Sequence, residues 1–250
     1  MAASTLDPLG DGVSKVELIW VKGDDLEVVN DARESFEKES DWEYSKGAGC
    51  YVLSNADSKL IKYLASHRHW TPFAGSYIKF RIKMPLFVAR EWFRHNMIDL
   101  GEGDIKPGFN RNEVSRRYVD FTPEFYLPKE WRARPDKGIK QGSGDVIREQ
   151  ALDIHSSYGH AVSNGLESYN FLLDLNVAPE MARMVLSQSM YTEFRESASL
   201  YAYAGLCDLR IAPNAQAETR KYAEAVSELI APYFPVSWPE LIQEIRKARE

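Results

Sequence analysis

Apolar and polar side chains alternate most regularly over residues 77–84, where the sequence reads YIKFRIKM. Every second residue from Ile78 to Met84 is apolar and the residues between them are basic, which predicts a strand with one buried face and one face in water. Residues 15–22, KVELIWVK, predict a second strand. Residues 1–14 contain small residues, Asp and Gly without such a pattern, so we expect a flexible tail there.

Other segments repeat their apolar residues at the spacing of a helix. The expected helices cover residues 26–40, 55–69, 143–175, 179–190 and 215–230, with a short one that begins at Ser237. The longest, 143–175, carries an apolar stripe over its whole length and is interpreted as a bundle or oligomer helix.

The densest polar side chains fall within residues 85–118. Pro85 suits the first position of a helix, and that helix carries Arg90, Glu91, Arg94 and His95. A glycine-containing loop follows over residues 96–110, and a strand is predicted over residues 116–121. Guanidinium groups bind phosphate and carbonyl oxygens, so Arg clusters on both sides of a loop indicate a nucleotide site; solvated i,i+4 pairs explain the helical cluster equally well.

Composition narrows the function classes. The chain has 250 residues and a net charge of −6, which favours a small anionic ligand over nucleic acid as partner. Cys50 and Cys207 form no CxxC motif, and His67 and His69 have no third ligand at useful spacing, so neither a disulfide framework nor a metal site is predicted. Without a basic leader or an apolar run of about 18 residues, we expect a cytoplasmic protein with no membrane contact.

Several segments resemble the flavin-dependent thymidylate synthases. The signature of that family is Arg-His-Arg, a short spacer, and a serine within Asn-Glu-x-Ser-x-Arg-Tyr; here FRH at 93–95 and NEVSRRY at 112–118 resemble it. Further similar segments are HWTPF, KMPLFVAREWFRH, PEMARMVL, MYTEF and LCDLRIAPNAQAE, in the family's order. The sequence is therefore identified as a member of this family over residues 15–235.

The resemblance implies a mixed α/β (α+β) fold with a twisted sheet and packed helices, in one domain over residues 15–250. It implies a homotetramer with active sites shared between subunits. FAD, NADPH and 5,10-methylenetetrahydrofolate are the implied cofactors, and the implied reaction is reductive methylation of C5 of UMP or dUMP.

The resemblance also implies roles for individual residues. The implied catalytic residues are Arg94, Ser115 and Arg210. The implied substrate-binding residues are Glu91, Arg94, Glu113, Ser115, Arg116, Arg117, Arg183 and Arg210. The implied cofactor-binding residues are Ser35, His69, Thr71, Arg94, His95, Asn96, Glu113, Ser199, Tyr201 and Gly205.

The signature cluster contains no cysteine, so it offers no nucleophile for covalent attack at uracil C6. A flavin hydride would fill that role. Ser115 has no histidine or lysine base nearby in the sequence, and we expect it to hydrogen-bond the substrate instead of attacking it.

The chain departs from the family at several expected flavin contacts. Asn96 replaces the last Arg of the signature, the 96–110 loop is longer than in the family, and Ser199, Tyr201 and Gly205 stand where Asn, Arg and Asn often occur. Either FAD binds through altered contacts or flavin is lost; we expect retention. Similar divergence is known in a member that methylates UMP in polyoxin-type nucleoside antibiotic biosynthesis, so a UMP C5-methylase is predicted. The alternatives are a housekeeping or phage dUMP thymidylate synthase and a non-catalytic uridylate-binding protein.

Overall fold

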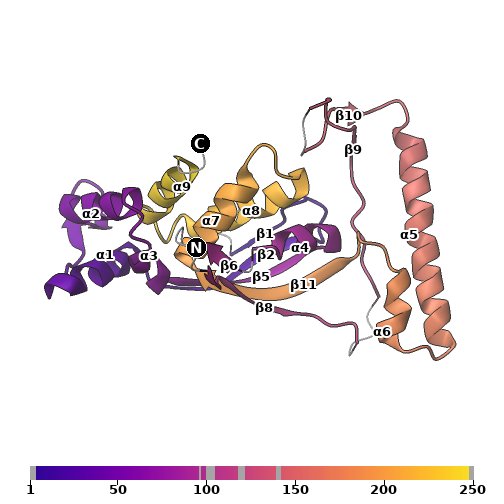
Figure 1. Cartoon of the computed structure of the whole chain (residues 1–250), viewed down its shortest axis with the longest axis horizontal. Helices are drawn as coiled ribbons and strands as arrows, with labels where there is room; N and C mark the ends of the chain where they lie inside the picture. The colour runs from indigo at the N-terminus through magenta and orange to yellow at the C-terminus, as the bar shows by residue number, and fades with distance from the viewer. Residues whose placement is uncertain (1–3, 96, 100–104, 118–121, 139–141, 248–250) are drawn as a thin grey trace.

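The protein was analysed as a computed structural model that describes residues 4–95, 97–99, 105–117, 122–138 and 142–247. Its centre is a five-stranded sheet in which every neighbouring pair is antiparallel (Figure 1). In spatial order the strands are β1 (Thr5–Leu6), β2 (Lys15–Lys22), β5 (Tyr77–Pro85), β11 (Tyr191–Ser199) and β8 (Phe109–Glu113). The expected mixed α+β fold with a twisted sheet and packed helices is confirmed.

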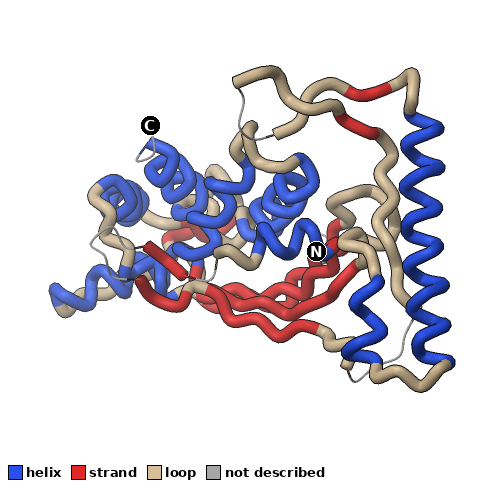
Figure 2. Tube along the Cα trace, turned by 45° about the vertical axis from the view of Figure 1, so that its right-hand side comes forward, coloured by secondary structure: helices blue, strands red, loops and turns tan. Residues whose placement is uncertain are grey.

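One face of the sheet is covered by helices (Figures 1 and 2). These helices are α4 (Leu86–Trp92), α7 (Leu200–Ile211), α8 (Ala217–Ile230) and α9 (Ser237–Lys247). The alternation in β5 decides which face they cover, because Ile78, Phe80, Ile82 and Met84 are all fully buried beneath them. The basic residues of β5 lie on the opposite face, over which no helix of the described chain passes.

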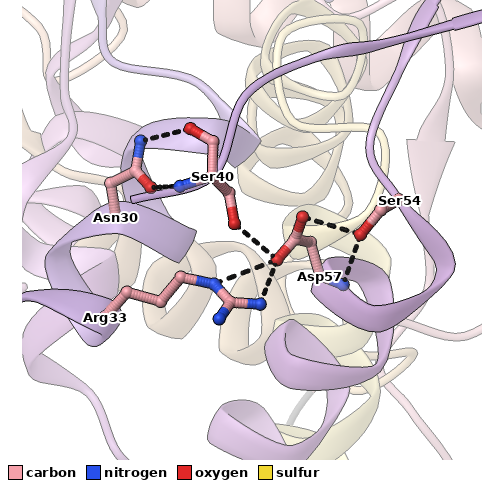
Figure 3. A network of polar contacts seen from close by, with 5 residues as sticks. All are labelled: Asn30, Arg33, Ser40, Ser54 and Asp57. Atoms are coloured by element: carbon pink, nitrogen blue, oxygen red, sulfur yellow. Dashed lines mark hydrogen bonds and ion pairs between the residues drawn. The ribbon is translucent and has the colours of Figure 1, made fainter. Parts of the chain in front are cut away.

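A smaller helical group lies at one end of the sheet. It consists of α1 (Asp25–Arg33), η1 (Glu34–Phe36), the hairpin β3 (Glu43–Ser45) and β4 (Cys50–Val52), α2 (Asn55–Ser66) and α3 (Thr71–Gly75). A polar network holds the irregular segment between α1 and α2 (Figure 3).

Asp57 is the centre of that network (Figure 3). Its carboxylate accepts hydrogen bonds from Arg33 Nη2 at 2.6 Å, Ser40 Oγ at 2.9 Å and Ser54 Oγ at 2.7 Å. Asn30 adds two bonds to the backbone of Ser40. The segment that contains η1 is therefore fixed at both ends by side chains of neighbouring helices.

At the other end of the sheet, α5 (Ala151–Asp174) stands as a long rod apart from the five-stranded sheet and the helices that cover it, which we call the body (Figures 1 and 2). We call α5 together with α6 (Pro179–Ala182) and η2 (Arg183–Val185) the arm. Of the 24 residues of α5, only Tyr169 is buried. The hairpin of β9 (Trp131–Arg132) and β10 (Val146–Ile147) leads into it.

The sequence predicted β2 and β5 correctly and several boundaries incorrectly. The flexible tail is wrong for residues 4–14, because β1 pairs with β2 and Ser14 Oγ accepts a hydrogen bond from the Leu9 amide. Pro85 ends β5 and caps α4 from outside instead of opening that helix. The helix predicted over residues 26–40 ends at Arg33, whose side chain belongs to the polar network.

Two further expectations were wrong near the signature. The predicted 96–110 loop contains the hairpin of β6 (Met97–Asp99) and β7 (Ile105–Pro107) and the start of β8. The strand predicted over residues 116–121 is replaced by a turn at Arg116 and Arg117, and residues 118–121 lie outside the described part of the chain.

The helix expected from residue 143 begins only at Ala151. No helix in the described residues is both long enough and apolar enough to cross a membrane.

Candidate functional site

A cavity of 750 Å³ opens where β8 ends, β11 begins and the arm meets the body. Its lining includes five predicted substrate residues: Glu113, Ser115, Arg116, Arg117 and Arg183. Residues 113–117 arrive together because they follow one another at the end of β8. Arg183 arrives from η2, nearly 70 residues later, because the arm folds back against the same strand end.

The acidic side of this cavity is held in place by a residue that the sequence did not single out. Thr192 Oγ1 donates a hydrogen bond of 2.5 Å to Glu113 Oε1. Thr192 is 8 % exposed and lies on β11, next to the end of β8, so its hydroxyl sets the direction of the Glu113 carboxylate. Thr192 belongs to the segment MYTEF, which resembles the family, but its contact with Glu113 depends on strand register and cannot be read from the sequence.

The basic side of the cavity is built from three arginines in different settings. Arg117 and Arg183 are exposed, and Arg117 Nε donates to Ser115 Oγ at 3.1 Å. Arg183 Nε donates to the Glu180 carbonyl at 3.2 Å, which holds its guanidinium at the cavity edge. Arg116 is 5 % exposed, with its guanidinium carbon 6.0 Å from the centre of the Tyr169 ring of α5. The cavity therefore presents positive charge to an anion. Through Arg116 and Tyr169 its wall contacts the arm.

The arm and the cavity wall approach each other closely at Gly165. A side chain there would place its Cβ 2.9 Å from the Val185 carbonyl oxygen of η2. Such a distance is too short for any residue other than glycine without a backbone shift. The position of Arg183 therefore depends on the surface of α5.

A second group of predicted residues lies outside the lining of this cavity. At the end of α4, Glu91 Oε1 accepts a bond of 2.6 Å from Arg210 Nη1, and the Glu91 carbonyl accepts one of 2.8 Å from Arg210 Nη2. Thr219 Oγ1 of α8 donates to Glu91 Oε2 at 3.0 Å. Arg94 follows as an exposed residue just after α4. Within one chain, the structure thus separates Glu91, Arg94 and Arg210 from the Arg183 cavity.

The predicted cofactor residues gather mainly where α3 meets the start of α7. His69 and Thr71 are exposed, and the rings of the neighbouring Trp70 and Tyr201 have centroids 6.3 Å apart. Leu200 N donates to the Ser76 carbonyl at 2.9 Å, which joins the two helices.

The other predicted cofactor residues differ in what they can offer. Ser199 Oγ accepts from the Ala202 amide at 3.2 Å and is buried, so it caps α7. Gly205 has no heavy atom within 4 Å of an added Cβ, so there is open space beside it. Ser35 is exposed on η1, His95 is half-buried, and Asn96 lies outside the described residues.

Comparison with known proteins identifies the family. The sequence model described as "Thymidylate synthase complementing protein" matches residues 17–236. The flavin-dependent thymidylate synthase of Thermus thermophilus is 35% identical over 228 residues, which cover 89% of this chain and 73% of that protein. The chain belongs to the flavin-dependent thymidylate synthase family. The enzyme of Kosmotoga olearia, 34% identical over 227 residues, covers 89% of this chain and 87% of its own length.

A solved structure resembles the whole chain. The crystal structure of a UMP/dUMP methylase, PolB from Streptomyces cacaoi, bound with 5-Br UMP, matches with a TM-score of 0.74 at 26% identity and covers 92% of this chain and 95% of that one. The chain is therefore a methyltransferase of the flavin-dependent thymidylate synthase type. This family methylates C5 of a uridine nucleotide and uses FAD, NADPH and methylenetetrahydrofolate.

Proposed function

We propose that this chain methylates C5 of uridine 5′-monophosphate, as the ribonucleotide or the deoxyribonucleotide, in a site completed by two subunits of a homotetramer. The carbon donor is 5,10-methylenetetrahydrofolate and the reductant is NADPH. The observation that carries the proposal is the cavity in which Glu113, Ser115, Arg117 and Arg183 converge from two distant segments.

The basic rim suits the phosphate of the nucleotide. A 5′-phosphate carries close to two negative charges at neutral pH and has three acceptor oxygens. Arg117 and Arg183 present exposed guanidinium groups at this cavity, and charge-assisted bonds from Arg to phosphate are among the strongest hydrogen bonds in proteins. We assign these two residues to the phosphate.

The inner side chains suit the sugar and the base. Ser115 Oγ lies 3.1 Å from Arg117 Nε and can bond a uracil carbonyl or imide group. Glu113, oriented by Thr192, offers an oxygen that accepts hydrogen bonds from a ribose hydroxyl or an N–H group. These residues bind and orient the pyrimidine, and none of them acts as a nucleophile in the proposal.

The separation of Arg94, Glu91 and Arg210 from the cavity supports a site shared between subunits. Across a two-fold interface the same surface of both subunits meets, and a residue of one subunit contacts a different residue of the other, so the α4 end of one chain can close the cavity of another. Arg94 would then polarise a uracil carbonyl and draw electron density away from C6, which favours hydride arrival there. Glu91, which accepts a hydrogen bond from Thr219, holds Arg210 for the same role.

The residues between α3 and α7 fit a flavin despite their substitutions. The open space beside Gly205 leaves room for a group on that side of α7, and His69, Thr71 and Ser35 are exposed polar residues. These residues, with His95, would hold the cofactor. When bound, FAD supplies hydride for the reductive step.

We propose that UMP is the preferred substrate, because the divergence of the chain at the flavin contacts resembles that of a UMP C5-methylase. PolB of Streptomyces cacaoi is a UMP/dUMP methylase, with structures bound with 5-Br UMP and with 5-Br dUMP. We propose the same dual acceptance here and a role in nucleoside antibiotic biosynthesis. Rates measured with UMP and dUMP under identical conditions test that preference.

Complementation between subunits tests the shared site. Arg94→Ala and Arg117→Ala each alter an exposed residue, and each variant alone should lose at least about 100-fold in kcat. Co-expressed with different tags and purified as mixed oligomers, the two variants should recover about a quarter of wild-type activity, because one in four random pairings joins two intact halves.

Two results would contradict the proposal. Mixed oligomers that stay inactive would place Arg94 and Arg117 in the site of a single chain or outside the site. A purified protein that stays colourless and binds no added FAD, while still binding UMP, would support the non-catalytic uridylate-binding alternative.

A further inference from the structure

We propose that Arg111 is a positioning residue, which fixes the turn of Arg94 and His95 relative to the nucleotide end of β8. Its importance for catalysis rests on the proposed function. Arg111 lies two residues before Glu113 on β8, and neither family resemblance nor sequence pattern assigned it a role.

Arg111 connects three elements through one guanidinium group. It pairs directly with Glu196 in the antiparallel register of β8 and β11, and its Nε forms an ion pair with the Glu196 carboxylate. Its Nη2 donates a hydrogen bond of 2.8 Å to the His95 carbonyl, just after α4. The end of α4 is therefore tied to the sheet at the residue next to Arg94.

The Glu196 carboxylate of β11 holds the Arg111 guanidinium in place. It is fully buried in the row of β11 that also contains Phe194 and Ala198, where a charged residue is unexpected. Trp92 Nε1 of α4 donates to it at 3.2 Å. Glu196 thus contacts Trp92 of α4 directly and is linked through Arg111 to His95, which follows that helix.

Aromatic rings enclose the pair. The Arg111 guanidinium carbon lies 5.1 Å from the centre of the Phe93 ring and 4.8 Å from that of Phe109, and only 10% of its side chain is exposed. Burial raises the pKa of the Glu196 carboxyl, and the Arg111 guanidinium opposes that shift.

A buried ion pair is a poor source of stability. Desolvation of two charges often offsets their attraction, and apolar residues of similar volume can be equally stable. The pair instead fixes the orientation of the turn of Arg94 and His95, because a planar guanidinium bonded to two fixed acceptors allows only one such orientation. Catalytic geometry requires such accuracy, since a shift of about 1 Å can reduce a rate by about 100-fold.

Lysine substitution separates positioning from charge. Arg111→Lys keeps a cation for Glu196, but one ammonium lacks the fork that reaches both the carboxylate and the His95 carbonyl. The matched control is Arg132→Lys, which alters the ion pair of Arg132 Nη2 on β9 and Glu218 Oε1 on α8, 2.5 Å apart.

Three measurements should distinguish these variants. Arg111→Lys should raise the FAD dissociation constant about tenfold and lower kcat by about 10–100-fold, with the nucleotide KM changed less, and Arg132→Lys should change none of these by more than about twofold. In the FAD-free protein, hydrogen exchange of the amides of residues 93–95 should accelerate in Arg111→Lys alone. This last readout tests the inference even if the protein proves to lack flavin chemistry.

A charge swap provides a second test. In Arg111→Glu/Glu196→Arg the ion pair remains, but the guanidinium now starts from β11 and no longer points to His95 from β8. If the swapped protein folds, it should keep slow exchange in β8 and β11 and lose FAD affinity. Wild-type exchange at residues 93–95 in Arg111→Lys, or full FAD affinity in the swap, would overturn the proposal.

Discussion

The body and the arm of this protein differ in how completely their side chains are buried. In the body, the sheet and its helices bury large side chains completely, among them Trp92, Phe194 and Tyr203. In the arm, a helix of 24 residues buries only Tyr169, while Leu152 is 87% and Phe171 is 62% exposed. A helix with so little buried surface gains little stability from its own chain. Such an exposed apolar helix suits the proposed homotetramer, in which neighbouring subunits would cover it.

The largest expected effect is a loss of stability in the body. Phe194→Ala removes a ring that is 1% exposed and packs edge-to-face on Phe93, with the centroids 4.9 Å apart. We expect the free energy of unfolding to fall by about 3–5 kcal/mol, measured by urea denaturation. The matched change in the arm, Leu152→Ala, should cost less than about 0.5 kcal/mol in dilute protein. Equal losses would remove the distinction between body and arm.

The next effect concerns association. Leu152→Ser/Phe171→Ser replaces two exposed apolar side chains of α5, and if they are buried between subunits the change should weaken assembly by about 3 kcal/mol, roughly a hundredfold in dissociation constant. Light scattering over a dilution series measures this directly. Far-UV circular dichroism should remain that of a folded chain. Unchanged association would assign the interface to another surface.

The smallest expected loss of stability comes from altering the polar network of Figure 3, which is held together by hydrogen bonds and not by apolar packing. Burial favours the neutral acid, but bonds from Ser54, Arg33 and Ser40 outweigh it and hold the pKa of Asp57 below its ordinary value. The stabilisation is therefore present above the unfolded pKa of about 3.9 and is lost as the pH falls through the lower folded value.

Asp57→Asn should cost about 1 kcal/mol near pH 7, because the amide accepts fewer bonds than the carboxylate. Its Tm should also fall less than that of the wild type between about pH 5 and pH 2. Asp153→Asn, at an exposed position of α5, serves as the control. Parallel pH curves for Asp57→Asn and the wild type would show that the network does not depend on the charge.

The sequence predicted well those features that depend on neighbouring residues. The alternation in KVELIWVK gave the bounds of β2, and the consecutive residues 113–117 gave one side of the cavity. It failed for β8, whose sequence FNRNE has no alternating apolar face and pairs because β11 lies beside it. Thr192 bonds Glu113 across 79 residues, and Arg111 meets Glu196 across 85, so only the register of the sheet reveals these contacts.

Gly165 connects the arm to the shape of the cavity, in addition to the proposed role of the arm in assembly. Because a methyl group there would push on the Val185 carbonyl, two residues from Arg183, the width of the cavity beside Arg183 is set partly by a helix that does not line it. If the proposed assembly and nucleotide site hold, substitutions along α5 are constrained twice, by the neighbouring subunits on its outer side and by the ligand on its inner side. Engineering of the outer surface can proceed freely only where the inner side is left intact.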